Sequence, residues 1–160
     1  MSATHYRLTV DTILIVSDAR TVIEDVRSVL DEREVEIIEI ESGAAVRSAV
    51  DFHDPDLVVT DFQVGNMGAM AICLDLRLEE SGGRLPHVPV LMLCDRRADV
   101  FLAKRSSAEG YLVKPLDPIR LRRAIRLLLD GESCHDESYK PISTTLTPVA
   151  PTGPFASAGS

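Results

Sequence analysis

The chain has 160 residues, of which 45% are hydrophobic, and these values predict one globular domain with an apolar core of ordinary size. Its formal net charge of −8 argues against a generic binder of nucleic acid or anionic membranes, because both require positively charged surface. Tryptophan is absent and only 4% of the residues are aromatic, which also disfavours surfaces that stack on nucleobases.

The start of the chain and its cysteines indicate the compartment. Residues 1–12 contain no apolar stretch of the kind found in signal peptides. No run of residues approaches the roughly 20 apolar residues that a membrane span needs. The three cysteines, at positions 73, 94 and 134, are odd in number and lack metal-ligand spacing. We therefore expect a cytoplasmic protein with reduced thiols and no membrane partner.

Short apolar runs alternate with helical patterns along most of the chain. The runs predict strands over residues 13–16, 35–40, 57–60, 88–93 and 110–113. The patterns between them predict helices over about 22–30, 43–52, 69–80, 99–106 and 117–128, the last beginning at an Asp-Pro N-terminal signal. Five strand–helix repeats with nearly continuous apolar strands predict an α/β fold with a doubly wound, five-stranded parallel sheet in the order 2-1-3-4-5.

The composition changes after this core. Residues 12–130 form the predicted domain, preceded by an N-terminal arm over residues 1–11. Pro, Ser, Thr, Gly and Ala dominate the end of the chain, and such a segment buries too little apolar surface to offset the entropy of ordering it. We therefore predict a disordered C-terminal tail over residues 131–160.

Charged residues follow three of the predicted strands at the point where each one ends. Asp18 follows the first strand, Asp61 the third, and Lys114, before Pro115, the fifth. The carboxyl ends of parallel strands share one edge of the sheet, where open α/β folds bind their ligands. Two carboxylates and an ammonium group gathered there suit a divalent cation and a phosphoryl group.

Four motifs carry a resemblance to a known family. They are ILIVSD at 13–18, PDLVVTDFQVGNMG at 55–68, PVLMLCD at 89–95 and EGYLVKPLDPIRLRRAI at 109–125. Together, and in this order, they resemble the receiver domain of two-component response regulators over residues 12–129. The resemblance implies a flavodoxin-like (βα)5 fold, in agreement with the order predicted from the strands and helices.

The resemblance also implies a role for each residue of the site. Asp61 would be the phosphoacceptor, and Lys114 would pair with its carboxylate and then with the phosphoryl oxygens. Mg²⁺ would bind Asp18, Asp61 and the backbone carbonyl of Gln63, and Ser17 could contact it through water. The bond from Lys114 to the following proline would be cis.

The chain departs from the family pattern at several positions. Ser17 replaces the first of two adjacent acids, which predicts weaker binding of Mg²⁺ rather than its loss. Cys94 stands at the position of the switch hydroxyl, where it is either a poor hydrogen-bond donor or simply a small buried apolar residue. Asp95 replaces a small residue and either repels the phosphoryl group or forms a local cap. Tyr111 occupies the position of the aromatic switch. Because Cys94 replaces the switch hydroxyl, we expect the coupling between the two positions to be weakened.

The last predicted helix is rich in arginine. Arg120, Arg123 and Arg126 lie on it, and the resemblance implies that this face contacts partners or forms a homodimer. The alternative is a solvated helix face without a partner. Both interpretations stay open from the sequence.

Two functions follow from these observations. The first is a single-domain response regulator in a phosphorelay, phosphorylated on Asp61 by a histidine kinase or phosphotransfer protein and signalling through altered protein contacts. The alternative is an atypical pseudo-receiver that binds proteins without phosphorylation. An enzyme is disfavoured because Gln63 stands where aspartyl-phosphate phosphatases carry a second aspartate, so only self-phosphorylation and dephosphorylation are expected. DNA binding would require an output domain that the tail cannot supply, so no nucleic-acid partner is expected.

Overall fold

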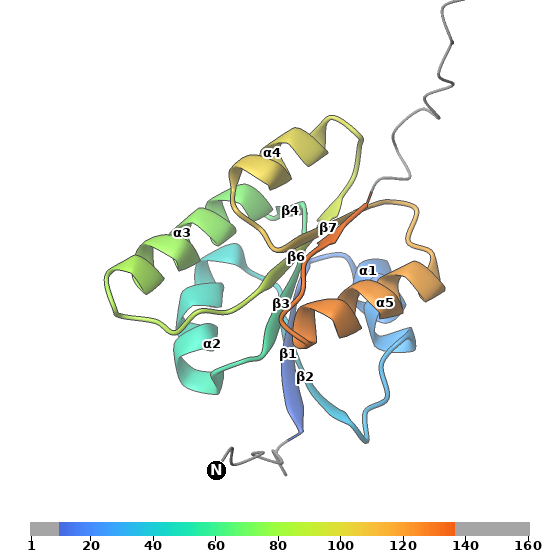
Figure 1. Cartoon of the computed structure of the whole chain (residues 1–160), viewed down its shortest axis with the longest axis horizontal. Coiled ribbons are helices and arrows are strands. Elements are labelled where there is room, and N and C mark those ends of the chain that lie inside the picture. The colour runs from blue at the N-terminus through green and yellow to red at the C-terminus, as the bar shows by residue number, and fades with distance from the viewer. Residues whose placement is uncertain (1–9, 137–160) are drawn as a thin grey trace, which may run out of the picture.

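A computed structural model of the chain describes residues 10–136 (Figure 1). The helical segments are α1 (Arg20–Ser28), the 3₁₀ turn η1 (Gly43–Ala45), α2 (Val46–His53), α3 (Ala69–Ser81), α4 (Asp99–Arg105) and α5 (Pro118–Leu129). The strands are β1 (Asp11–Val16), β2 (Val35–Ile40), β3 (Leu57–Asp61), β4 (Gln63–Val64), β5 (Met67–Gly68), β6 (Val90–Cys94), β7 (Gly110–Val113) and β8 (Cys134–His135). The predicted N-terminal arm, apart from its last two residues, and the predicted tail beyond residue 136 lie outside the described residues.

The main sheet is parallel and confirms the predicted order. Its strands run β2-β1-β3-β6-β7-β8, so the five predicted strands occupy the order 2-1-3-4-5. The register pairs Val16 with Thr60 and Asp61 with Leu93, which aligns the carboxyl ends of β1, β3 and β6. A separate two-stranded antiparallel ribbon, β4 and β5, forms the loop between β3 and α3.

The main sheet has a sixth strand, β8, that the sequence did not predict. It lies within the segment from residue 131 that we expected to be a disordered tail, so that expected start was wrong. Gly131 has a φ of +83°, which suits a glycine and turns the chain back after α5. Cys134–His135 then pairs in parallel with β7, so β7, α5 and β8 form one more strand–helix–strand unit. A two-residue strand is too short to show a hydrophobic period, which is why the sequence pattern missed it.

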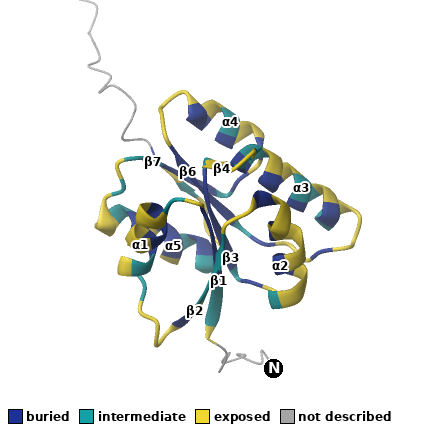
Figure 2. Ribbon diagram, turned by 180° about the vertical axis from the view of Figure 1, so that it is seen from behind, coloured by how far each residue is buried: buried dark blue, intermediate teal, exposed yellow. Residues whose placement is uncertain are grey.

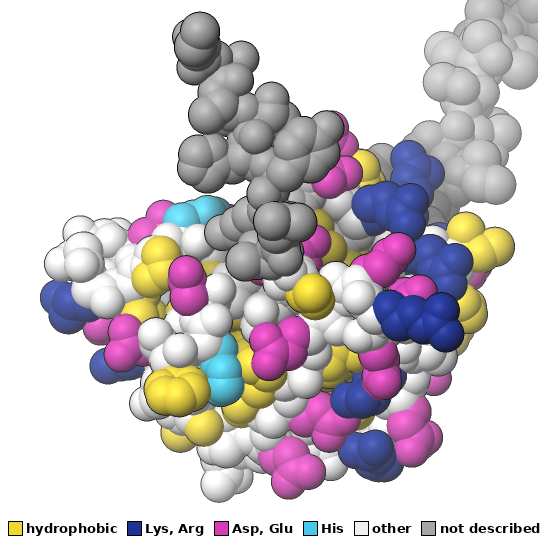
Figure 3. Space-filling view, turned by 90° about the horizontal axis from the view of Figure 1, so that it is seen from below, with side chains coloured by type: hydrophobic (Ala, Val, Ile, Leu, Met, Phe, Trp, Pro, Cys, Tyr) yellow, Lys and Arg dark blue, Asp and Glu magenta, His cyan; other side chains and the backbone are white. Residues whose placement is uncertain are grey.

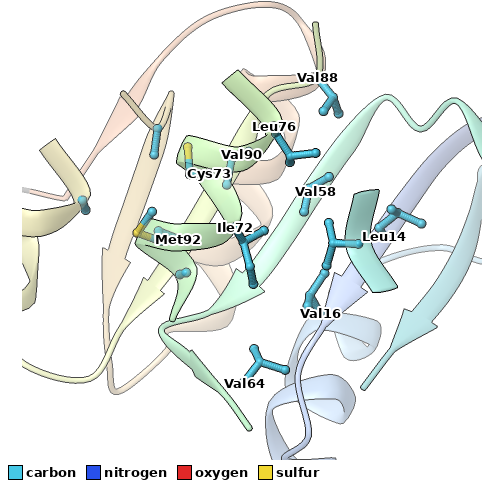
Figure 4. Close-up of a cluster of buried hydrophobic side chains, with 14 of the residues drawn as sticks. Leu14, Val16, Val58, Val64, Ile72, Cys73, Leu76, Val88, Val90 and Met92 are labelled. Carbon is cyan, nitrogen blue, oxygen red and sulfur yellow. The ribbon is translucent and has the colours of Figure 1, made fainter. Parts of the chain in front are cut away.

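Two apolar cores lie on the two faces of the sheet (Figure 2). One packs α2, α3 and α4 against the sheet, with Leu14, Val58 and Met92 facing Ile72 and Leu76 of α3 (Figure 4). The other packs α1 and α5 against the opposite face. Because successive side chains of a strand point to opposite faces, strands covered on both sides must be apolar throughout, as the sequence shows.

The helix limits agree closely with the periodicity, with one local difference. Asp117 caps α5 by accepting a hydrogen bond from the Ile119 backbone N–H at 2.8 Å, and Pro118 opens the helix. The helix expected over 43–52 begins as the η1 turn and becomes α-helical only at Val46. No helix among the described residues is long and apolar enough to cross a membrane.

Acidic and basic side chains are interspersed over the face seen from below (Figure 3). Basic side chains gather on the side of this face where α1 and α5 lie. The groove there is lined by Arg122 and Arg126 together with Asp31, Glu34 and Asp130. The net negative charge of the chain therefore does not make this face uniformly acidic.

Candidate functional site

The carboxyl edge of the sheet brings the predicted residues together. Asp61 ends β3, and Lys114 follows the last residue of β7. Although 53 positions separate them in the sequence, Lys114 Nζ lies 2.6 Å from Asp61 Oδ1. The aligned ends of parallel strands produce this proximity. The bond between Lys114 and Pro115 is cis, as the resemblance implies.

Asp61 is buried, and both oxygens of its carboxylate accept hydrogen bonds. The residue is only 5% exposed. Oδ1 accepts hydrogen bonds from Lys114 Nζ and from the Phe62 backbone N–H at 2.9 Å. Oδ2 accepts a hydrogen bond from the Ser17 hydroxyl at 3.1 Å. A charged donor therefore holds Oδ1, whereas the Oδ2 side is held by a neutral hydroxyl that is easier to displace.

Lys114 is shared between two carboxylates. Its Nζ also lies 2.7 Å from Asp95 Oδ1, just beyond the end of β6. Burial lowers the pKa of Lys114, but hydrogen bonds with Asp61 and Asp95 outweigh it, so the pKa is raised above its ordinary value. Neither sequence interpretation of Asp95 anticipated this ion pair. The cap expected of Asp95 comes from Asp99, whose Oδ2 accepts the backbone N–H groups of Asp95 and Arg96 at 3.1 and 2.8 Å.

Ser17 and Asp18 have different surroundings although they are adjacent. Ser17 is completely buried, and its hydroxyl accepts the Ala19 backbone N–H at 3.0 Å while donating to Asp61. Asp18 is exposed, and its Oδ2 accepts the Gly65 backbone N–H at 2.9 Å. Asp18 thus ties the end of β1 to the β4–β5 loop, beside Asp61.

The donor set at this edge fits Mg²⁺ in its chemistry. Mg²⁺ commonly binds one or two carboxylates and completes its octahedron with waters and phosphate oxygens. Asp18 and Asp61 supply two carboxylates, and Gln63, the first residue of β4, supplies a backbone carbonyl two positions after Asp61. Within residues 10–136 no three His, Cys, Asp or Glu side chains form a group able to hold a metal. Waters and a phosphoryl group would therefore have to supply the remaining ligands.

Cys94 ends β6 and is completely buried. Desolvation, together with the nearby Asp99, Asp95 and Asp136 carboxylates, raises the pKa of its thiol to about 12. The thiol is therefore protonated at neutral pH and a poor nucleophile. These surroundings support the interpretation of Cys94 as a small apolar residue.

Tyr111 is buried and packs in the same core as Cys94. Its ring stacks on the ring of His135 in β8, with centroids 5.1 Å apart and an interplanar angle of 14°. The residue at the predicted aromatic-switch position is therefore buried, and its ring lies beside a residue of a strand that the sequence did not reveal.

The arginines of α5 do not form one uniform surface. Arg120 makes an ion pair with Asp136, which is 4% exposed and follows β8. Arg123 and Arg126 are exposed. Asp136 was missed as a structural residue because it lies in the segment assigned to the tail, and no local pattern marks its pairing with Arg120.

Comparison with known proteins identifies the family. The response regulator receiver domain family matches residues 13–126, and the chain belongs to this family. Receiver domains are signalling modules of two-component systems. The fold, with its parallel sheet and its acidic residues at the carboxyl edge, agrees with this assignment.

Individual relatives support the assignment. The DNA-binding response regulator MtrA of Mycobacterium tuberculosis strain H37Rv is 30% identical over 119 residues, covering 73% of this chain and 50% of MtrA. The nitrate/nitrite response regulator protein NarL of Escherichia coli strain K12 is 29% identical over 89 residues, covering 56% of this chain and 40% of NarL. The chain thus spans about half the length of these relatives or less. Among solved structures, the chemotaxis response regulator CheY4 of Vibrio cholerae matches with a TM-score of 0.65 at 20% identity, covering 75% of this chain and 99% of CheY4.

Proposed function

We propose that this receiver accepts a phosphoryl group on Asp61 and signals by changing its contacts with other proteins. The observation that carries the proposal is the 2.6 Å contact between Lys114 Nζ and Asp61 Oδ1 at the ligand-binding edge of the sheet. A buried carboxylate next to a fixed ammonium group can accept a phosphoryl group whose charge that ammonium then neutralises. The donor would be a phosphohistidine of a kinase or phosphotransfer protein.

The geometry suggests which oxygen reacts. Oδ2 carries the Ser17 hydrogen bond, whereas Oδ1 is held by Lys114 and the Phe62 backbone. We infer that Oδ2 attacks phosphorus after the Ser17 hydroxyl turns away. As the new oxygen–phosphorus bond forms, the bond from phosphorus to the histidine nitrogen of the donor breaks.

Asp18, Asp61 and the Gln63 carbonyl are the groups that would hold Mg²⁺. When bound, the ion would neutralise phosphoryl charge. The residues of this chain do the positioning, since Asp18 fixes the adjacent loop and Lys114 supplies a second positive charge. That the receiver acts alone remains a prediction, because the chain spans half or less of the two relatives described above.

The test is phosphorylation by a small-molecule donor, acetyl phosphate, in the presence of Mg²⁺. We expect intact-mass spectrometry to show one added phosphoryl group that is absent from Asp61→Asn. The exposed Asp51→Asn on α2 is the matched control and should be phosphorylated as the unchanged protein is. An unmodified protein, or a modified Asp61→Asn variant, would contradict the proposal.

The alternative is a pseudo-receiver that binds partners without phosphorylation. Two contacts favour it, since Ser17 donates to Asp61 Oδ2 and Asp95 competes for Lys114. Amide NMR with Mg²⁺ and beryllofluoride, which mimics a phosphoryl group, separates the two functions. Shifts that begin at Asp61 and reach Tyr111 support the phosphorylated switch, whereas no response supports the pseudo-receiver.

A further inference from the structure

The edge strand β8 is attached to β7 mainly through backbone and carboxylate contacts. The Cys134 backbone N–H donates to the Glu109 carbonyl, and the Asp136 backbone N–H donates to the Tyr111 carbonyl, both at 3.1 Å. An uncovered β7 would present these carbonyls to any extended chain that can pair with them. The last six described residues, 131–136, therefore occupy a surface suited to strand addition.

Asp136 provides the specific part of this attachment. One of its oxygens, Oδ2, accepts the Val113 backbone N–H at 3.0 Å, and the other pairs with Arg120 of α5. Such contacts offset the cost of burying a carboxylate, which is high when the charge is unpaired. The β7 edge therefore offers a backbone N–H and a guanidinium group to a carboxylate at this position.

The segment that contains β8 borders an open surface pocket. Residues of β7, α5 and the segment from Ser133 to Asp136 line this pocket. His135 is exposed although it stacks on Tyr111, and only two residues of the segment are in regular strand pairing. So short an edge strand has few contacts to lose when it detaches.

The position of β8 connects it to the functional site. Val113, which donates to Asp136, immediately precedes Lys114, whose own backbone N–H donates to the Cys94 carbonyl at 2.9 Å. Detachment of β8 would break the hydrogen bond from the Val113 N–H to Asp136, next to Lys114 in the chain. It would also remove the ring of His135 from its stack on Tyr111.

We propose that the β7 edge is a binding site for an extended, carboxylate-bearing protein segment, and that residues 134–136 are its intramolecular occupant. A partner segment with Asp or Glu at the position of Asp136 binds after these residues detach. The inference goes beyond the proposed phosphorylation and does not depend on it, because every contact that carries it is present without a phosphoryl group.

The first experiment measures amide hydrogen exchange in the full chain, without a phosphoryl donor. Asp136→Ala removes the acceptor of the Val113 N–H, and Arg120→Ala removes the partner of the carboxylate. We expect both to accelerate exchange at Val113 at least tenfold, while the Val59 amide in the centre of the sheet is unchanged and shows that the fold is intact. Asp130→Ala, at the exposed end of α5, is the matched control and should not change the exchange at Val113.

The second experiment supplies the strand from outside. A synthetic peptide with the sequence of residues 131–136 is titrated to millimolar concentration, because a tethered segment has an effective concentration of roughly millimolar order. We expect saturable NMR shifts at Tyr111 and Val113 in the Asp136→Ala variant at lower peptide concentrations than in the unchanged protein, where residues 134–136 compete with the peptide for the edge. Unchanged exchange at Val113 in both variants would overturn the proposal. Failure of the Asp136→Ala variant to take up the peptide would overturn it equally.

Discussion

The hydroxyl of Ser17 lies 3.1 Å from Oδ2 of Asp61 and donates a hydrogen bond to it. Both residues are buried, at the ends of two adjacent parallel strands. A serine at this position therefore does more than remove one negative charge from the proposed cation site. It also occupies the carboxylate oxygen that we expect to react.

Replacing Ser17 by aspartate should strengthen Mg²⁺ binding. The change removes the hydrogen bond to Asp61 and adds a carboxylate, whose attraction to a cation at about 4 Å is on the order of 4 kcal/mol per unit charge before solvation near a surface. After solvation we expect about tenfold tighter binding, or about 1.4 kcal/mol, in calorimetric titration. Ser48→Asp on the exposed side of α2 is the control. Equal affinities for Ser17→Asp and the unchanged protein would contradict the prediction.

Removing the Asp95 carboxylate should favour phosphorylation. Lys114 is then paired with Asp61 alone, and no negative charge competes for its ammonium group. Because Asp95 is substantially exposed, we expect a contribution of only about 0.6–1 kcal/mol, which is about a three- to fivefold rise in the yield of phosphorylated protein with limiting acetyl phosphate. Asp51→Ala serves as the control. A lower yield for Asp95→Ala would mean that Asp95 positions Lys114 productively.

Cys94 should make the protein less stable in alkaline solution. Its thiol pKa is raised from 9.0 to about 12 by burial and nearby carboxylates, so the folded chain keeps a proton that the unfolded chain loses. The free energy of unfolding is therefore not reduced by this thiol below pH 9. It falls as the pH rises from 9 toward 12, by at most about 1.4 kcal/mol per pH unit.

Urea unfolding between about pH 8 and pH 11 provides the measurement. Cys94→Ala should show a shallower loss of unfolding free energy with pH than the unchanged protein. The other two cysteines, whose pKa values are also raised, are present in both chains and cancel in the comparison. Parallel curves would show that Cys94 does not titrate differently in the folded state.

A side chain at position 110 should destabilise the fold. A Cβ at this position would lie 2.9 Å from Leu128 Cδ1 and 3.0 Å from the Cys134 carbonyl oxygen of β8. Gly110→Ala should therefore lower the free energy of unfolding by about 1–3 kcal/mol and loosen the pairing of β8 with β7. In Gly68→Ala the nearest atom would be 3.7 Å away, so this control should lose much less stability. Equal losses in the two variants would exclude crowding as the cause.

The sequence by itself determined the sheet and the location of the candidate site. Apolar runs separated by helical periodicity are local patterns, and each can be recognised within a short window. Parallel connections then leave few possible strand orders, so Asp61 and Lys114 could be placed at one edge despite their separation. Their distance of 2.6 Å agrees with that placement.

Only the tertiary structure decided how the side chains at this edge are paired. The ion pairs of Asp95 with Lys114 and of Asp136 with Arg120 depend on side-chain directions and on the exact ends of strands, which hydrophobic patterns do not encode. The sequence did not predict β8 for a related reason. A strand of two residues is too short to show a hydrophobic period, and it forms because it can pair with the edge of β7.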